Sequence, residues 1–600
     1  MLTDFKNFLI LFIFCNTILF AQNDTINLKE VTVSTNRISL PSFNSSRTIN
    51  IITQEEIKRS TASNVADLLQ HISGIDVRRR GVDGTQSDLY IRGGNFDQTL
   101  LLIDGIKMDD AQTGHHTMNA ILALDNIERI EVLKGPASRV FGQNAFAGAI
   151  NIITKKNVSK ELKAGVSYGS YENIKGSLRL SEQIGNGDIQ LHLQKQKSDG
   201  YRFNTDFDNT SIFLKTNIKD YELLATFNER KFGANGFYAS PDYKDQYEET
   251  QTSLIALSSE YITKNLVIKP RIYWRRNQDM YLFLRENPTY YRNLHISNKL
   301  SAEVNMVLSS DLGKTGFGVD FSKVFLVSNN LGDHNRFMMT SFLEHRFEIG
   351  DNFDITLGVA LSYFSDFDAK IFPGLDLGFR VSDRVTMYGN IGYTYRIPTF
   401  TDLYYVGPTT QGNANLKPES ALAEEIGVKF ISEKIQWNFA IFNRNSNDLI
   451  DWTKDNLEDK WETRNFSNVI TKGFETSLKY KFKIGDYTQN IYLGYNFIDD
   501  NIKDSNVDFT RYSLNSLKHQ MSTSIRTKFS SRLDQSINFR FVERTNGETY
   551  NVLDANMRAK FNKLELSVSV NNIFNTEYTE TNLVPMPKAN MMLGVSYQIF

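Results

Sequence analysis

Short runs in which apolar and polar residues alternate fill the chain from Leu162 to the C-terminus, and they constrain the fold more than any other feature. Examples lie at residues 189–194, 435–441, 491–497 and 564–570. Because neighbouring side chains of a β-strand point to opposite faces, each run predicts a strand with one apolar and one polar face. After residue 21, no apolar run approaches the roughly 18 residues that a membrane-spanning helix needs. The pattern leaves a transmembrane β-barrel or a secreted β-sandwich or propeller, and it favours the barrel.

The connections between these runs alternate between short and long. Residues 185–187 form a brief glycine-rich turn, whereas residues 232–250 form a long polar and aromatic connection. Outer-membrane barrels have this asymmetry, with short periplasmic turns and long outer loops. If residues 157–600 form the barrel, about 20 residues for each strand and its share of loop give roughly 22 strands. We therefore expect an all-β transmembrane barrel of about 22 antiparallel strands, which leaks unless its lumen is filled.

The composition excludes several classes of function. The 67 Lys and Arg residues stand against 69 Asp and Glu residues, so there is no basic excess for binding nucleic acid. Cys15 is the only cysteine, which excludes disulfide scaffolds, cysteine-ligated zinc and thiol catalysis in the chain that follows it. Lys6, the apolar run at residues 8–20 and Ala21 predict a secretory signal peptide over residues 1–21. We therefore expect an exported protein.

Residues 41–156 have a different pattern, which predicts a small mixed α/β domain. Thr53 and Glu56 have the spacing of a helix capping box. Ser63 is expected to cap a second helix that runs through Ile72 before Gly74. Strand-like segments separated by glycines lie at residues 47–52, 89–91, 100–103 and 130–133. This domain is the expected plug of the barrel.

Several motifs, in a fixed order, resemble those of TonB-dependent outer-membrane transporters. They lie at residues 28–34, 91–93, 102–105, 127–138, 142–154, 396–400, 415–419 and 571–575. The resemblance covers nearly the whole mature chain, and the plug spacing and compact length are most similar to the cobalamin transporters. It implies a plugged barrel in the bacterial outer membrane that takes up a large, scarce nutrient, here cobalamin or a related corrinoid. It implies neither enzyme activity nor a cofactor.

Other functions remain open at this point. A ferric-siderophore or haem receptor shares the same motifs, but members of this family that take up haem place a histidine between the two motifs at residues 396–400 and 415–419. Here that interval offers Tyr404 and Tyr405 and no histidine. A passive pore or structural barrel would need no plug. A sensory receptor and a soluble secreted enzyme are the remaining alternatives.

The motif at residues 28–34 resembles the TonB box, and residues 22–40 would form the periplasmic segment that carries it. Val31 and Val33 alternate with polar neighbours, so the motif can add as a strand to an exposed sheet edge of TonB. TonB, energised by a proton-driven complex of the inner membrane, would then pull on the plug. The expected TonB-binding residues are Leu28, Lys29, Glu30, Val31, Thr32, Val33 and Ser34. The alternative is that they form only the first strand of the plug.

Four charged residues of the plug motifs are expected to lock it in place. They are Arg92, Glu128, Arg129 and Glu131. Inside a barrel an unpaired charge is costly, so we expect these side chains to pair with one another or with the wall. The alternative is a solvated charged face in a wet lumen.

The resemblance also places the ligand. In the cobalamin-transporter pattern, the outward tips of the plug are residues 80–87 and 109–116, and the loop at residues 236–243 approaches them. The expected ligand residues are Arg80, Gln86, Ser87, Asp109, Asp110, Phe237, Tyr238 and Tyr243. Aromatic faces beside polar tips suit a large amphipathic ligand. The alternative is that these are solvent-exposed tips or aromatic residues of the barrel rim.

No metal site is expected, because His115 and His116 are interpreted as plain loop residues and the acidic residues between 499 and 508 as a solvated loop tip. The expected partners besides TonB and the nutrient are outer-membrane lipid and the barrel assembly machinery, because the terminal Phe600 resembles the assembly signal. We expect a monomer that binds no nucleic acid.

Overall fold

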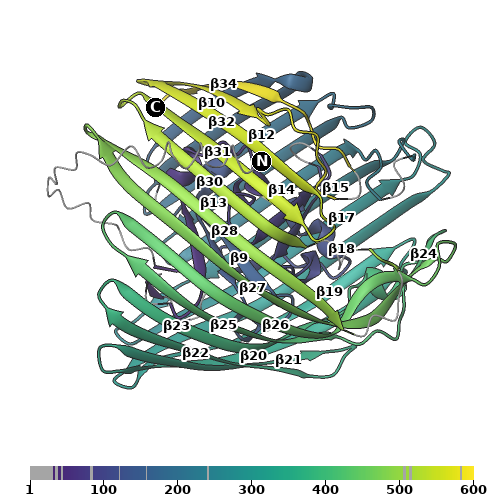
Figure 1. The fold of residues 1–600 in the computed structure, drawn as a ribbon, viewed down its shortest axis with the longest axis horizontal. Coiled ribbons are helices and arrows are strands. Elements are labelled where there is room, and N and C mark those ends of the chain that lie inside the picture. The colour runs from purple at the N-terminus through teal and green to yellow at the C-terminus, as the bar shows by residue number, and fades with distance from the viewer. Residues whose placement is uncertain are drawn as a thin grey trace, which may run out of the picture. The chain divides into compact units, whose positions relative to one another are not determined.

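The computed structural model describes residues 32–33, 38, 40–41, 43, 45–81, 85–120, 122–156, 158–238, 242–503, 509–511, 516–581 and 584–600 (Figure 1). The predicted signal peptide, residues 1–21, lies outside the described residues. Among the helices that are described, none is both long and apolar enough to cross a membrane.

A closed barrel of 22 antiparallel strands forms the wall, which confirms the predicted fold class (Figure 1). The wall strands are β10 (Glu161–Gly169), β11 (Asn173–Ile184), β12 (Gly187–Ser198), β13 (Phe207–Ile218), β14 (Tyr221–Gly233), β15 (Tyr247–Ser259), β17 (Leu266–Leu282), β18 (Arg292–Ser310), β19 (Gly313–Ser328), β20 (His334–Ile349), β21 (Phe353–Phe364), β22 (Lys370–Ser382), β23 (Val385–Arg396), β25 (Glu419–Ile431), β26 (Ile435–Lys454), β27 (Trp461–Ile484), β28 (Tyr487–Lys503), β30 (Leu517–Lys528), β31 (Leu533–Arg544), β32 (Thr549–Phe561), β33 (Leu564–Asn571) and β34 (Asn590–Gln598). The first wall strand pairs with the last, which closes the barrel.

The alternating runs place apolar side chains outside the wall and polar side chains in the lumen. On β12, Leu193 is 37% exposed, whereas the neighbouring His192 is buried. Gln190 of the same strand points inward and donates to the carbonyl of Lys155 in the plug (3.0 Å). On β26, Ile441 is 57% exposed. An apolar exterior around a polar lumen is the arrangement of a membrane barrel.

The connections at the two ends of the barrel differ, as predicted. At one end only two residues join β11 to β12, and Gly185 takes the left-handed conformation of that turn (φ 58°). At the other end, residues 234–246 join β14 to β15, and residues 397–418 join β23 to β25. We name the end with the long connections the outer end, following the usual orientation of outer-membrane barrels. Short elements outside the wall strands are η5 (Ser170–Glu172), β16 (Tyr261–Ile262), α5 (Phe400–Tyr404), β24 (Thr410–Gln411) and β29 (Phe509–Thr510).

The plug precedes the wall in the chain and is a mixed α/β domain, as predicted (Figure 1, purple). Its five-stranded sheet has the order β3-β8-β9-β6-β7, and a two-stranded sheet joins β4 to β5. The elements of this part are β1 (Thr32–Val33), β2 (Leu40–Pro41), β3 (Ile49–Thr53), α2 (Gln54–Lys58), α3 (Val65–Leu69), β4 (Ile75–Arg79), β5 (Ser87–Ile91), η2 (Phe96–Gln98), β6 (Thr99–Ile103), β7 (Ile106–Lys107), η3 (Gly114–Ala120), η4 (Leu124–Asn126), β8 (Ile127–Lys134), α4 (Ser138–Phe141) and β9 (Gly148–Thr154).

The hydrophobic core of the plug extends to the wall. Leu69, Val132 and Ile150 of the plug pack in one buried cluster with Phe213 of β13 and Leu224 of β14. Each large apolar side chain buried in this way contributes about 1.5–3 kcal/mol. The plug is therefore packed against the wall as well as linked to it by polar contacts.

The helix starts of the plug confirm one local prediction and correct another. Thr53 and Glu56 form the predicted capping box of α2, with Thr53 N–H donating to the Glu56 carboxylate (2.8 Å). The second helix, α3, is capped by Asn64 instead of Ser63, because the Asn64 side chain accepts from the Asp67 N–H (2.9 Å). Ser63 hydroxyl donates to the Asp67 carboxylate instead (2.7 Å). This helix is also shorter than predicted, since it ends at Leu69.

Candidate functional site

A buried ion cluster joins the plug to the wall. Arg92 of the plug lies 2.5 Å from Glu425 on β25 and 2.9 Å from Glu475 on β27. Lys134, the last residue of β8, lies 3.0 Å from the same Glu475 and donates to the carbonyl of Ser73 (2.6 Å). Burial lowers the pKa of Lys134, which Glu475 opposes. We call Arg92, Lys134, Glu425 and Glu475 the central ion cluster.

The backbone of the plug aims Arg92 at the wall. Arg92 follows β5 and has a φ of 46°, in the left-handed region that costs an L-residue about 1 kcal/mol or more. Its N–H donates to the carbonyl of Gly74 (2.9 Å), which also has a positive φ. Two turns of the plug therefore hold each other in the conformation that presents this guanidinium to the wall.

A second ion cluster lies where the chain enters the plug. Arg47 and Arg139 both contact Asp376 on β22, at 2.8 Å and 2.5 Å. Arg139 also lies 3.9 Å from Glu344 on β20, and Glu344 accepts from the backbone N–H of Ile38 (3.2 Å). Ile38, just before the plug, is thus bonded directly to the wall. No sequence feature pointed to Asp376 and Glu344 as partners, because an acidic residue that faces the lumen cannot be told from the other polar residues of the alternating pattern.

The other predicted lock residues pair along β8. Arg129 lies 2.8 Å from Glu131 and 3.5 Å from Glu128. Glu131 is fully buried, whereas the side chain of Glu128 is 45% exposed. Of the four predicted lock residues, Arg92 therefore pairs with the wall, as part of the central ion cluster.

Part of the predicted TonB box lies in a short hairpin. Thr32 and Val33 form β1, which pairs antiparallel with β2, with Thr32 opposite Pro41 and Val33 opposite Leu40. The remaining predicted box residues lie outside the described residues; they are Leu28, Lys29, Glu30, Val31 and Ser34. Leu40 is buried.

Of the predicted ligand residues, Tyr243 is exposed and the others are buried or half-buried. Their role in ligand binding stays a prediction. Asp109 lies 2.6 Å from Lys299 on β18, and Asp110 lies 2.9 Å from Arg275 on β17. Arg80 lies 3.3 Å from Asp88 within the plug. These ion pairs hold the tips against the wall or against the plug itself.

The loop between β14 and β15 covers another of these tips. Phe237 packs in a buried apolar cluster with Phe207 and Phe232 of the wall. The hydroxyl of Tyr238 contacts the amide oxygen of Gln86 in the plug and the carboxylate of Glu248 on β15, and it can donate to either. Phe237 is therefore packed against the wall, and the adjacent Tyr238 contacts the plug.

The two adjacent plug histidines, His115 and His116, have carboxylate partners, so they are not plain loop residues. His115 lies 2.7 Å from Asp88, and His116 lies 3.1 Å from Asp279 on β17. Burial alone would lower the pKa of His116, but the charge and hydrogen bond of Asp279, together with the charges of Glu248 and Asp110, raise this pKa to about 9. Within the described ranges, no group of three or more histidine, cysteine or acidic side chains is arranged to hold a metal ion.

A third ion cluster joins the plug to the long connection at residues 397–418. Arg396 lies 2.9 Å from Asp97 of the plug, 2.5 Å from Asp402 of α5 and 2.8 Å from Glu419 of β25. Gln98 of the plug donates to Glu419 (2.6 Å). Burial, against the opposing charge of Arg396, raises the pKa of Asp97 to about 6.

Comparison with known proteins places this arrangement in a family. Residues 161–573 match the family described as TonB dependent receptor-like, beta-barrel, and residues 41–149 match the TonB-dependent Receptor Plug Domain. The chain is 24% identical over 471 residues to the vitamin B12 transporter BtuB of Vibrio vulnificus strain YJ016, covering 76% of this chain and 75% of the relative. It is 21% identical over 629 residues to BtuB of Vibrio cholerae serotype O1 strain O395, covering 96% of each.

Solved structures share the fold. The ferric-catecholate import receptor Fiu of Escherichia coli K12 has a TM-score of 0.75 at 16% identity, covering 95% of this chain and 99% of that one. The siderophore receptor PirA of Acinetobacter baumannii has a TM-score of 0.73 at 16% identity, covering 92% and 98%. With a plug joined to a closed barrel by buried ion clusters, and with a barrel match that spans most of its length, the chain belongs to the family of TonB-dependent receptors of the outer membrane.

Proposed function

We propose that the protein actively takes up a large, scarce nutrient across the bacterial outer membrane, driven by TonB, and that the nutrient is cobalamin or a related corrinoid. The central ion cluster is the observation that carries this proposal. A plug bonded to the wall through Arg92, Lys134, Glu425 and Glu475 closes the lumen, so a large solute passes only when work moves the plug. A passive pore has no use for such a closure, and the proposed activity is transport, with no covalent chemistry.

The substrate assignment is supported by the similarity to vitamin B12 transporters over nearly the whole chain. A ferric siderophore is the second candidate, because siderophore receptors share the fold. That likeness concerns the fold alone, so it supports the substrate less than the sequence similarity does. In this proposal Tyr243, which is half exposed, is the first of the predicted ligand residues that an incoming nutrient meets.

The proposed organisation follows the sequence. Residues 1–21 are the signal peptide, residues 22–40 carry the TonB box, residues 41–156 are the plug and residues 157–600 are the barrel. The box residues 28–34 bind TonB, which is driven by the proton gradient of the inner membrane. The barrel assembly machinery inserts the protein into outer-membrane lipid as a monomer.

Uptake of labelled substrate by intact cells tests this proposal. A strain that lacks the gene is complemented with the wild-type protein and given radiolabelled cyanocobalamin or a labelled ferric siderophore. We expect accumulation of cyanocobalamin that stops when an uncoupler collapses the proton gradient. Accumulation of the siderophore alone would transfer the assignment to the second candidate. Uptake that continues with the uncoupler would reject active transport.

A further inference from the structure

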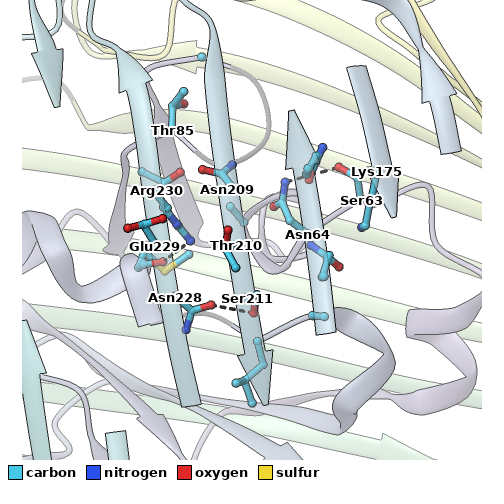
Figure 2. A pocket seen from close by; sticks show the side chains of 18 of the residues that line it. Ser63, Asn64, Thr85, Lys175, Asn209, Thr210, Ser211, Asn228, Glu229 and Arg230 are labelled. Carbon is cyan, nitrogen blue, oxygen red and sulfur yellow. Dashed lines mark hydrogen bonds between the residues drawn. The ribbon is translucent and has the colours of Figure 1, made fainter. Parts of the chain in front are cut away.

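A cavity lies between the plug and four neighbouring wall strands, β11 to β14 (Figure 2). Its volume is about 830 Å³, counting the space at its mouth that is open to solvent. The plug contributes the start of α3, at Ser63 and Asn64, together with Arg79 and Ser87. Polar side chains of the wall form the opposite side. We call this space the side cavity.

The wall side of the side cavity is a panel of two polar rows. The first row, read from β11 to β14 through directly paired residues, is Lys175, Gln196, Asn209 and Arg230. The second row, two residues further along each strand, is Ser177, Gln194, Ser211 and Asn228. Residues two apart on a strand share a face, so both rows point into the lumen. Leu178, Leu193 and Ile212 alternate with them and are exposed on the outside of the wall.

Apolar side chains bound this panel along the strands. Towards the outer end, Phe207 is paired with Phe232, and both pack with Phe237 in a buried cluster. In the other direction, Phe213 belongs to the hydrophobic core of the plug. The polar rows therefore lie between an outer and an inner cluster of apolar side chains.

The charges in the side cavity are not balanced. Arg79 is paired with Asp67 (2.5 Å) and Glu580 (2.8 Å). Glu229 also lines the cavity, but its carboxylate lies 3.3 Å from Lys231. By contrast, neither Lys175 nor Arg230 forms an ion pair with any residue in the described part of the chain, although the charge of Glu248 acts on Arg230. Among the described residues, Arg230 donates to neutral groups, the carbonyl of Met118 (3.1 Å) and the amide oxygen of Asn119 (3.4 Å).

One buried amide offers a further donor. Asn228 is only 5% exposed, and its oxygen accepts from the hydroxyl of Ser211 (2.8 Å). Its Nδ2 has no hydrogen-bond partner among the residues that the structure describes. Figure 2 shows Asn228 and Ser211 side by side at the wall of the cavity, beneath Arg230 and Asn209. A buried donor without an acceptor is costly, so a group that supplies acceptors would be stabilised here.

We infer that the side cavity is a binding site for an anionic oxygen group, a phosphate or a carboxylate. Lys175 and Arg230 supply the positive charge from the two ends of the first row, and Asn228 supplies a neutral donor. Water alone would satisfy the amide but would leave the two cations without an ion-pair partner among the described residues. The occupant is either a free anion or an anionic group of the nutrient on its way past the plug. The second source rests on the proposed uptake function.

The charge of the cavity can be measured without knowing the nutrient. Ser211→Cys places a thiol in the second row, and the parent protein without this substitution gives the background. The purified full-length protein is treated with the anionic 2-sulfonatoethyl or the cationic 2-trimethylammonioethyl methanethiosulfonate. We expect the anionic reagent to react about tenfold faster, because a cleft of one charge concentrates ions of the opposite charge. Adding Lys175→Gln and Arg230→Gln should remove this preference.

A matched control removes two cations from the outside of the same wall. Lys195 and Lys197 lie on β12 with side chains 50% and 62% exposed. Lys195→Gln with Lys197→Gln changes the net charge equally and should preserve the preference. Equal rates for the two reagents would overturn the anion site, as would a preference that survives the loss of Lys175 and Arg230. So would a thiol that reacts with neither reagent until the protein is unfolded.

Two further measurements separate the sources of the anion, one with inorganic phosphate and one with cyanocobalamin. Inorganic phosphate is added during labelling of the Ser211→Cys protein with and without Lys175→Gln and Arg230→Gln. If phosphate slows the anionic reagent only when Lys175 and Arg230 are present, the cavity is a site for free anions. For the nutrient, radiolabelled cyanocobalamin is the probe, since it carries a phosphate diester. If the cavity lies on its path, the double variant should bind it at the surface normally and import it several-fold more slowly. Unchanged import would reject this second source. Absence of cyanocobalamin import by the wild type would reject cobalamin as the nutrient while leaving the labelling result intact.

Discussion

Arg92 of the plug and Glu475 of the wall lie 2.9 Å apart, and the side chain of each is at most 3% exposed. They are 383 residues apart in the sequence. Burying two charges costs several kcal/mol each, and only their mutual attraction and further hydrogen bonds offset this cost. The pair is therefore favourable only when the plug is seated, because moving the plug leaves a buried charge on the wall without its partner.

Glu475→Gln should loosen the plug, because Glu475 pairs with both Arg92 and Lys134. Removing one partner of a buried ion pair costs about 3–5 kcal/mol. In a planar bilayer with increasing urea, the barrel should begin to conduct at a lower urea concentration than the wild type. Glu462→Gln is the control on the same strand, since the side chain of Glu462 is 48% exposed in its pair with Arg464. Equal urea thresholds for all three proteins would contradict a locking role for the cluster.

Val31→Pro should uncouple the transporter from TonB. Proline removes the backbone donor that a strand needs to pair with a partner's sheet edge. We expect energised uptake to fall to background while the substrate still binds at the cell surface. Val31→Ile retains the donor and the β-branched side chain, so it should transport normally. Normal energised uptake by the proline variant would reject residues 28–34 as the TonB box.

The hairpin of β1 and β2 should have to open for transport, because it already pairs Thr32 and Val33 within the chain. Thr32→Cys with Pro41→Cys places two thiols at opposed positions, where Cα atoms lie within reach of a disulfide. After oxidation, substrate binding should persist and uptake should stop, and a reducing agent should restore it. Each single variant is the control. Full uptake by the oxidised double variant would show that TonB binds without opening the hairpin.

The sequence predicted those features that depend on local spacing. The period of two in the wall and the capping box of Thr53 and Glu56 each need only a few neighbouring residues, and the number of strands follows from the length of the barrel segment. The central ion cluster was predicted only in part, because Glu425 and Glu475 meet Arg92 through strand order and register, which no single segment contains. The burial of most of the predicted ligand residues could not be predicted for a similar reason. The burial of residues such as Phe237 follows from packing against Phe207 and Phe232 of other segments.

His116 should make the stability of the protein depend on pH between about 6.5 and 9. Its folded-state pKa of about 9 lies above the ordinary value, because Asp279 favours the charged form. A raised pKa contributes stability that is complete below the unfolded value of about 6.5 and is lost as pH rises through 9, amounting to about 3 kcal/mol. Thermal unfolding at pH 6 and pH 10 should therefore show a larger loss for the wild type than for His116→Gln. An equal loss in both proteins would contradict this assignment.

The outer loop separates a structural aromatic residue from a candidate ligand contact. Phe237 is fully buried, so Phe237→Ala leaves a cavity that costs about 3–5 kcal/mol and should lower the melting temperature. Tyr243 is 50% exposed, and its ring centroid lies 5.1 Å from that of Phe283. Because Tyr243 is so exposed, Tyr243→Ala should leave stability unchanged. If this aromatic pair contacts cobalamin, losing one ring should weaken equilibrium binding of cyanocobalamin by about five- to tenfold. Phe203→Ala, on the connection between β12 and β13, is the exposed aromatic control. If Tyr243→Ala binds cyanocobalamin as tightly as the control does, Tyr243 is not part of the ligand site. If the wild type binds it no more tightly than an unrelated barrel does, cobalamin is not the substrate.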